Sequence, residues 1–337
     1  MKKLIVISLS LAVWSSLLLV GATVWAQQPI RMRYASFWPP THDQSMGQED
    51  WCKEVNKRTD GRVKIDFYPG GTLIPPAQTY DSIVKGIGDI GFVMFSYTRG
   101  KFPLTEVLEL PLGIKDAKTA TKLANAYFMK FKPKEFDEVK VLYIYASIPK
   151  IIDTKKPIAK LEDLKGIKFR CTGLDSKVVE KLGGVPVGMP ISEAYDALSK
   201  GVVDGTVNPA ESLEMFKLAP LLKYQIENFS SAGVSAMAVV MNKSKWNALP
   251  KDIQSILENM DQEWTEKMGR LWDEMETKAK KYIVNSGMQI VKLPPEEDAR
   301  WKQAVQPLLT EYVQTMKAKG LPGEAALNFC IDFLKKQ

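Results

Sequence analysis

The sequence predicts an α/β protein of two similar lobes, with a cleft between the lobes and a long helix spanning both. Three observations predict this class. Strand-like and amphipathic helical segments alternate along most of the chain. A segment that begins at Tyr80 is echoed by one that begins at Tyr195. A long helical pattern without proline follows the second copy and is able to reach both lobes.

The N-terminus has the pattern of a secretory signal peptide. Lys2 and Lys3 precede an apolar run over residues 4–20, and small residues lead to Ala26. Cleavage there would leave a mature chain beginning at Gln27 in the periplasm. A retained membrane anchor is the alternative, but the apolar run is short for a membrane span.

Composition and charge narrow the possible functions. The 311 residues that remain after the first 26 of 337 exceed what one core usually supports, so two lobes are expected. The formal net charge is +7, of which Lys2 and Lys3 supply two. The remaining excess of five is scattered among acids, so no nucleic acid is expected as a partner.

Eight segments along the chain have the apolar and β-branched patterns of strands, and helical patterns separate many of them. The predicted strands are residues 31–37, 62–68, 89–95, 140–146, 166–171, 204–208, 222–229 and 234–242.

The internal echo suggests that the two lobes are built alike. Residues 80–89 and 195–204 agree in identity or type at seven of their ten positions. Each copy predicts a helix ended by glycine and an Asp that leads into the next strand. In open α/β sheets ligands bind beyond the carboxyl ends of the strands, so facing lobes would form a binding cleft. Chance similarity between two amphipathic helices is the alternative explanation.

The long helical pattern predicts the element that joins the lobes. From Lys251 apolar residues recur at helical spacing, and we interpret the Met and Trp stripe as core packing rather than a cofactor site. The expected division is a signal peptide at 1–26, lobe I at 27–148 with about 235–260, lobe II at 149–234 with about 285–320, a bracing helix at 251–284 and a C-terminal helix at 321–337.

The sequence offers little for catalysis. His42 is the only histidine, so a histidine-based metal cluster within one chain is excluded, and we expect His42 to cap a helix. No nucleotide-binding or hydrolase motif occurs. Cys52, Cys171 and Cys330 lie far apart and favour three free thiols over one disulfide. We expect no enzyme, metal or cofactor, and an enzyme using carboxylates alone is the open alternative.

Arg170 is the candidate for ligand recognition. Alternation along residues 166–171 places Lys168 and Arg170 on the opposite face from Ile167 and Phe169. Arg170 then stands at the carboxyl end of a strand, where its guanidinium could hold a carboxylate through two parallel hydrogen bonds. Taken alone, the residue is better explained by a surface salt bridge than by a ligand contact.

Motifs along the whole mature chain resemble the DctP-type substrate-binding proteins of tripartite ATP-independent periplasmic (TRAP) transporters. The motifs are residues 37–42 (FWPPTH), 67–73 (FYPGGTL), 85–91 (KGIGDIG), 102–104 (FPL), 109–111 (ELP), 156–158 (KPI), 162–170 (EDLKGIKFR) and 201–209 (GVVDGTVNP). Each motif is weak alone, and their order makes the resemblance specific.

The resemblance implies the two-lobed periplasmic-binding-protein fold and hinge closure around a ligand. It implies a receptor that binds a small organic carboxylate and delivers it to a TRAP membrane permease, as a monomer by family default. Arg170 is then expected to pair with the carboxylate and Asn208 to hydrogen-bond it. Ile191 falls where several relatives carry an aromatic residue, which suggests a cleft of different shape.

Lys150 marks a departure from the family pattern. Some relatives that bind sialic acid carry a second arginine where this chain has Pro149, with Lys150 beside it. Lys150 either supplies a point charge to the ligand or faces solvent. Sialic acid is therefore not the expected ligand.

Aromatic residues just beyond predicted strands are expected to form the wall of lobe I. These are Phe37, Trp38, Phe95 and Tyr97, with the hydroxyl of Ser96 between the last two. They suggest an aromatic or branched hydroxy or keto acid as ligand. The alternatives are a receptor for a sensor kinase or an ABC importer, and a secreted carboxylate-based hydrolase.

Overall fold

The first of two sheets has five strands and is mixed. The computed structural model describes residues 28–98 and 100–337. The strand order is β2-β1-β3-β10-β4, with β1 parallel to β2 and β3, and β10 antiparallel to both β3 and β4. These strands are β1 (Ile30–Ala35), β2 (Val63–Tyr68), β3 (Ile90–Met94), β4 (Val139–Ala146) and β10 (Ala236–Asn242).

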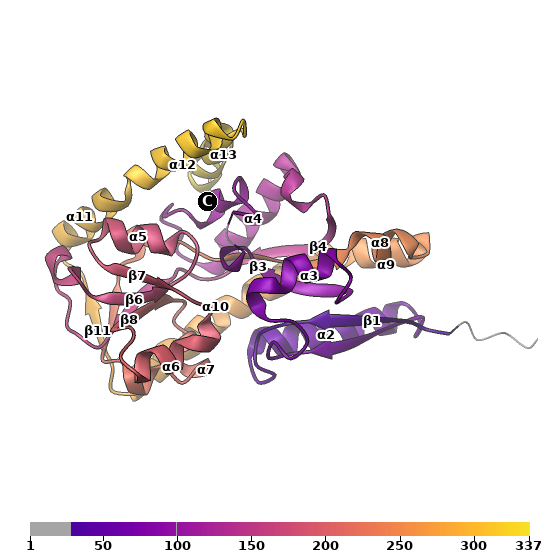
Figure 1. Cartoon of the computed structure of the whole chain (residues 1–337), viewed down its shortest axis with the longest axis horizontal. Coiled ribbons are helices and arrows are strands. Elements are labelled where there is room, and N and C mark those ends of the chain that lie inside the picture. The colour runs from indigo at the N-terminus through magenta and orange to yellow at the C-terminus, as the bar shows by residue number, and fades with distance from the viewer. Residues whose placement is uncertain (1–27, 99) are drawn as a thin grey trace, which may run out of the picture.

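The second sheet has six short strands in the order β11-β9-β5-β8-β6-β7. Strand β6 runs parallel to β7 and β8, and β5 is antiparallel to β8 and β9. The strands are β5 (Ile151–Thr154), β6 (Lys168–Cys171), β7 (Val185–Gly188), β8 (Gly205–Asn208), β9 (Tyr224–Glu227) and β11 (Gln289–Lys292). Figure 1 shows each sheet with its own helices, as the predicted two-lobed α/β class requires.

Helices flank both sheets, and most begin where the sequence supplies a cap or proline. His42 caps the first of them, as predicted, because its Nδ1 accepts a hydrogen bond from the Gln44 amide at 3.1 Å. The first sheet carries α2 (Asp43–Arg58), α3 (Thr79–Val84), α4 (Ala117–Phe131), α8 (Lys243–Ala248) and α9 (Lys251–Asn259). The second carries α5 (Asp175–Lys181), α6 (Ala194–Ser199), α7 (Ser212–Met215) and α11 (Pro295–Val305).

The predicted long helix is present but interrupted at Met260. The chain leaves α9 at Asn259 and continues as α10 (Asp261–Asn285). No proline or glycine marks the break. The acidic first turn of α10, with Asp261 and Glu263, suits the start of a new helix because carboxylates favour a helix N-terminus. Helix α10 contacts α2, α4 and β4 on one side and α7 and β11 on the other, so it touches both sheets' layers.

Two short segments that join the sheets are paired with each other. Ser147 donates its amide to the Ser235 carbonyl at 2.9 Å, and Lys150 donates its amide to the Gly233 carbonyl at 2.9 Å. Gly233 is required there, since a Cβ atom would lie 2.2 Å from the carbonyl oxygen of Glu109. These paired segments, residues 147–150 and 233–235, form a two-stranded connection between the sheets, and we call them the hinge because short connections of this kind are where lobes can bend.

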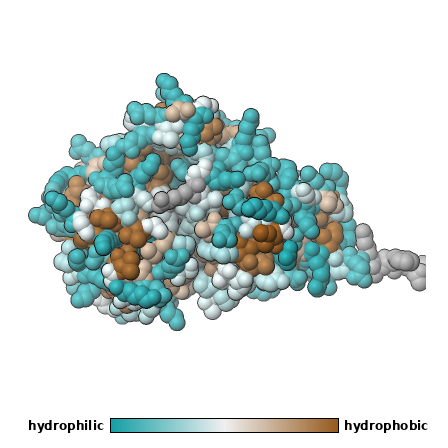
Figure 2. All heavy atoms as spheres, viewed as in Figure 1, coloured by the Kyte–Doolittle hydropathy of each residue, from teal (hydrophilic) through white to brown (hydrophobic). Residues whose placement is uncertain are grey.

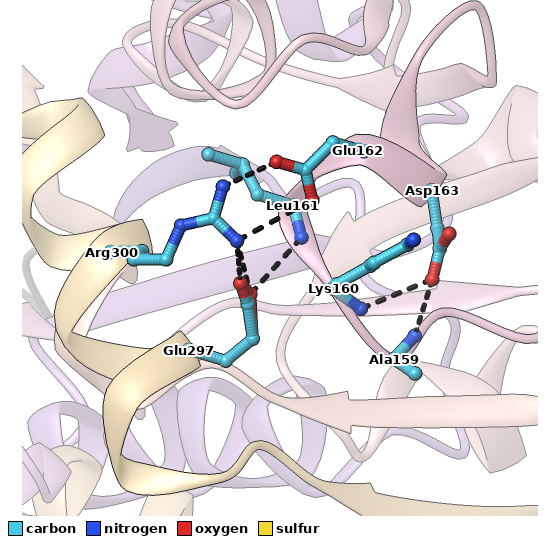
Figure 3. Close-up of polar contacts among 7 residues, drawn as sticks. All are labelled: Ala159, Lys160, Leu161, Glu162, Asp163, Glu297 and Arg300. Carbon is cyan, nitrogen blue, oxygen red and sulfur yellow. Dashed lines mark hydrogen bonds and ion pairs between the residues drawn. The ribbon is translucent and has the colours of Figure 1, made fainter.

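The chain ends in helices that return to the first sheet. Helix α11 is tied to residues 159–163, where Arg300 pairs with Glu162 and Glu297, and Asp163 accepts the Ala159 amide (Figure 3). Helices α12 (Pro307–Ala318) and α13 (Gly323–Leu334) then lie against α4 and the turn at 105–109. Tyr312 donates its hydroxyl hydrogen to the Leu104 carbonyl at 2.7 Å.

Hydrophilic residues dominate the face shown in Figure 2, and the three cysteines lie in the interior. Hydrophobic residues form small separate patches on the face in Figure 2. Cys52, Cys171 and Cys330 are buried and free. Within residues 28–98 and 100–337 no helix combines the length and apolar character needed to cross a bilayer. The predicted signal peptide and its cleavage site at Ala26 lie outside the described residues.

Candidate ligand-binding site

A small, largely enclosed cavity lies where the ends of strands from both sheets meet the hinge and α10. It is lined by Trp38, Met94, Tyr97, Ser147, Lys150, Arg170, Thr172, Ile191, Val207, Asn208, Pro209, Ser212, Ser235 and Trp272. Trp38 and Met94 stand at the carboxyl ends of β1 and β3, and Arg170 and Asn208 at those of β6 and β8. The position is the one expected for ligands of α/β sheets.

Arg170 is held rigidly at the cavity wall. Its side chain is only 3% exposed, its Nε donates to the Met189 carbonyl at 3.0 Å, and its Nη1 lies 3.5 Å from the Val207 carbonyl. Among the ion pairs of the described residues none involves Arg170. The backbone carbonyls therefore fix the plane of a buried guanidinium that forms no direct ion pair, although its charge opposes the rise in pKa that burial causes at Asp175 and Tyr97.

Tyr97 connects the two lobes across the cavity. Its hydroxyl oxygen accepts the amide hydrogen of Ile191 at 3.1 Å. Burial raises the pKa of Tyr97, although the nearby Arg170 charge opposes the rise, so the hydroxyl stays protonated. A contact between the end of β3 and the segment after β7 exists only when the lobes are together, so Tyr97 marks a closed arrangement.

Asn208 is oriented by a buried polar network. Its Nδ2 donates to Asp153 Oδ2 at 3.2 Å and to the Pro209 carbonyl at 3.1 Å, while its Oδ1 accepts from Thr206 at 2.5 Å. Asp153 also accepts from Gln225 at 3.0 Å. Burial raises the pKa of Asp153 well above the ordinary range, and both hydrogen bonds oppose the rise. Asp153 thus positions the amide of Asn208.

Lys150 does not face solvent. Its side chain is 2% exposed and its Nζ lies 2.8 Å from Oδ2 of Asp175, which is equally buried. Glu109 is buried nearby and accepts the Ala236 amide at 3.1 Å. Burial raises the pKa of Glu109 from 4.5 to about 7, although Lys150 lowers it. The sequence placed Lys150 in the site but gave no sign of Asp175 or Glu109.

An aromatic wall closes the opposite side. Trp38 stacks on His42 with ring centroids 4.2 Å apart, and Trp272 meets Trp38 edge-on at 5.8 Å. His42 Nε2 lies 3.9 Å from a carboxylate oxygen of Glu211, which also accepts from Ser212 at 2.9 Å. Burial raises the pKa of Glu211, and the contact with His42 opposes this. These side chains offer a flat apolar surface rather than a catalytic group.

Six of the nine residues proposed from sequence line this cavity, namely Trp38, Tyr97, Lys150, Arg170, Ile191 and Asn208. Phe37, Phe95 and Ser96 do not. Phe37 lies beneath Trp38 and Tyr97, at 4.5 and 5.2 Å between ring centroids. Phe95 packs against Phe102 in the core, at 4.7 Å. Ser96 abuts Gly173, where a Cβ atom would lie 2.7 Å from that of Ser96.

Other lining residues escaped the sequence reasoning. They are Ser147, Thr172, Val207, Pro209, Ser212, Ser235 and Trp272, whereas Met94 belongs to the segment 94–97 that was expected to face the cleft. Thr172 and Pro209 directly follow strand ends that were identified, so extending each end by one residue would have found them. Trp272 was interpreted as core because it belongs to an apolar stripe at helical spacing. Ser147 and Ser235 belong to the hinge pairing, which no local pattern reveals. In the described segments no group of three or more His, Cys, Asp and Glu side chains could hold a metal.

Comparisons with known proteins agree on one family. The model of DctP, "Bacterial extracellular solute-binding protein, family 7", matches residues 34–315. The C4-dicarboxylate-binding periplasmic protein DctP of Rhodobacter capsulatus is 28% identical over 321 residues, covering 89% of this chain and 94% of that protein.

Solved structures share the fold along nearly their whole length. A TRAP periplasmic solute-binding protein from Bordetella bronchiseptica, with bound (R)- and (S)-mandelate, is 30% identical with a TM-score of 0.85, covering 91% of this chain and 99% of that one. A TRAP solute-binding protein from Rhodoferax ferrireducens, in complex with copurified benzoate, is 28% identical with a TM-score of 0.87, covering 91% and 98%.

Proposed function

The chain belongs to family 7 of the bacterial extracellular solute-binding proteins, the DctP family, and we propose that it captures one small organic carboxylate outside the cytoplasmic membrane for delivery to a TRAP-type permease. Members of this family are receptors. The finer parts of the proposal are export to the periplasm through cleavage after Ala26, action as a monomer, and release of the ligand unchanged. The mass of the secreted chain and of the ligand recovered after denaturation test the first and last of these.

The buried guanidinium of Arg170 carries the proposal. Removing an ion from water costs several kcal/mol unless a counter-ion is supplied. The Met189 and Val207 carbonyls supply hydrogen-bond acceptors but no charge. A carboxylate in the cavity would supply that charge, with two parallel hydrogen bonds in a water-poor space. The amide of Asn208, held by Asp153, would donate to the same carboxylate or a neighbouring hydroxyl.

The remaining wall suits an aromatic or branched hydroxy or keto acid. Trp38, Trp272 and Ile191 line the cavity with apolar surface, as is usual for pockets that bind small molecules. The hydroxyls of Ser147, Ser212 and Thr172 would orient a polar substituent. Mandelate and benzoate in two relatives are ligands of this kind.

A thermal-shift screen tests the function. The panel holds small aliphatic, keto, hydroxy and aromatic acids, each beside its amide. We expect one or more acids to raise the melting temperature while their amides do not, since a ligand of the folded state must stabilise it. Arg170→Ala should weaken binding of the acid about 100-fold or more. Arg170→Lys should recover only part of that affinity, because an ammonium group cannot donate the two parallel hydrogen bonds of a guanidinium. Unchanged affinity in Arg170→Ala would refute the role of Arg170.

A further inference from the structure

The cavity has one cation that is free to receive a ligand charge. Of its lining residues only Lys150 and Arg170 are charged. Lys150 is already paired with Asp175, because its Nζ lies 2.8 Å from Oδ2 of Asp175 and both side chains are 2% exposed. Arg170 contacts backbone carbonyls instead. Within the described part of the chain, the two lining cations and the carboxylate paired with Lys150 together carry a net of one positive charge.

Buried carboxyl groups stand directly behind this lining. Asp153 holds the amide of Asn208, and Glu211 accepts a hydrogen bond from Ser212. Glu109 lies beside Gly173 and belongs to the charged surroundings of Lys150. All three side chains are fully or nearly buried. Whether protonated or ionised, none of these carboxyl groups supplies the positive charge that a second ligand carboxylate would need.

We propose that this receptor selects monocarboxylates and rejects dicarboxylates, because the Lys150–Asp175 pair removes the second positive charge that a dianion would need. The proposal deepens the proposed function and rests on it. A second carboxylate would be buried without a counter-ion and beside the acids named above, at a cost of several kcal/mol. Such a cost corresponds to about 100-fold or more in affinity. Family membership alone does not supply this selectivity, since the relative from Rhodobacter capsulatus carries the name of a C4-dicarboxylate-binding protein.

The first experiment compares matched acids by titration calorimetry at pH 8, where both carboxyl groups of a dicarboxylic acid are ionised. The probes are benzoate, mandelate, phthalate, succinate and malate, with the monomethyl esters of the three dicarboxylates. The esters keep the carbon skeleton and remove one charge. We expect the tightest monoanion to bind about 100-fold or more tightly than any dianion, and no dianion to exceed its own ester.

The second experiment frees the second cation. Asp175→Asn removes the one carboxylate that lies within ion-pair distance of Lys150 among the described residues, and only the charge of Glu109 still acts on it from farther away. The gap between the tightest dianion and the tightest monoanion should therefore shrink to about tenfold or less. The double variant Asp175→Asn with Lys150→Met removes the freed charge and should restore the wide gap. Asp196→Asn, exposed on α6 and far from this pair in sequence, is the control for loss of one acid.

The outcomes separate the inference from the function. A dianion that binds wild-type protein as tightly as the best monoanion overturns the selectivity while leaving a carboxylate receptor. A gap that Asp175→Asn leaves unchanged overturns the role of the ion pair. If no acid of either charge binds, the proposed function itself fails. Should Asp175→Asn not fold, the comparison on wild-type protein still decides the selectivity.

Discussion

Replacing Glu109 with Gln should change how stability depends on pH. Burial raises the pKa of this carboxyl group from 4.5 to about 7 in the folded protein. The folded state therefore holds a proton between these values that the unfolded state has released. The protonated Glu109 carboxyl group therefore contributes to the free energy of unfolding. This contribution is fully present below pH 4.5 and is lost as the pH rises through about 7. A shift of about 2.5 units corresponds to about 3 kcal/mol.

The assay is urea unfolding of both proteins at pH 5 and pH 8. Gln keeps an oxygen that accepts the Ala236 amide but does not titrate. The unfolding free energy of Glu109→Gln, relative to wild type, should therefore increase by about 3 kcal/mol from pH 5 to pH 8. Other buried acids contribute to both proteins and largely cancel. Glu296→Gln, exposed on α11, should show no such change. Parallel pH profiles for Glu109→Gln and wild type would refute the reasoning.

Two further predictions concern closure of the lobes. Gly173→Ala should weaken ligand binding about tenfold or more, measured by calorimetry, because its Cβ would lie 2.7 Å from that of Ser96 across the lobes and its φ of +52° strains a side chain. Ser96→Gly should restore part of the affinity, and a failure to do so would leave strain alone as the cause. Without ligand, Arg170→Met should have a smaller radius of gyration in X-ray scattering than wild-type protein, because no charge is buried when its lobes close. A radius equal to that of wild type would contradict closure controlled by this charge.

Much of this arrangement could be predicted from sequence because it depends on short-range patterns. Alternation in residues 166–171 and the turn at Thr172 and Gly173 placed Arg170 at a strand end, where the structure has it. Of the three strands that no pattern identified, β7 and β11 are the edge strands of the second sheet and bury no residue fully, while β5 is buried at all four positions, so none of them alternates between a buried and an exposed face. The fold class depended on the other strands and on the echo, so these omissions did not affect it.

The state of each charge could not be predicted, because it depends on residues distant in the chain. Lys150 precedes β5 and Asp175 begins α5, so β5 and β6 lie between them in sequence. Only the tertiary fold brings Nζ of Lys150 to 2.8 Å from Oδ2 of Asp175. Phe95 and Ser96 stood at the correct strand end, yet the short helical turn at Phe95–Tyr97 directs Phe95 into the core and leaves Tyr97 at the cavity. The end of a strand therefore predicts which segment lies near the cavity, whereas the geometry of the following turn determines which of its side chains lines the cavity.

The same charge that recognises the ligand can couple recognition to closure. In an open arrangement Arg170 would be hydrated, and closing the lobes around it without an anion would bury an ion at a cost of several kcal/mol. A carboxylate removes that cost only when the lobes meet, so it binds the closed form more tightly by the same amount. Ligand binding shifts a conformational equilibrium only through such a difference in affinity. The Tyr97 hydroxyl, which accepts the Ile191 amide across the lobes, adds a hydrogen bond available only after closure. On the proposed function, Arg170 would oppose closure of the empty receptor and permit it once a single carboxylate is present, so that a closed arrangement would report occupancy to a membrane partner.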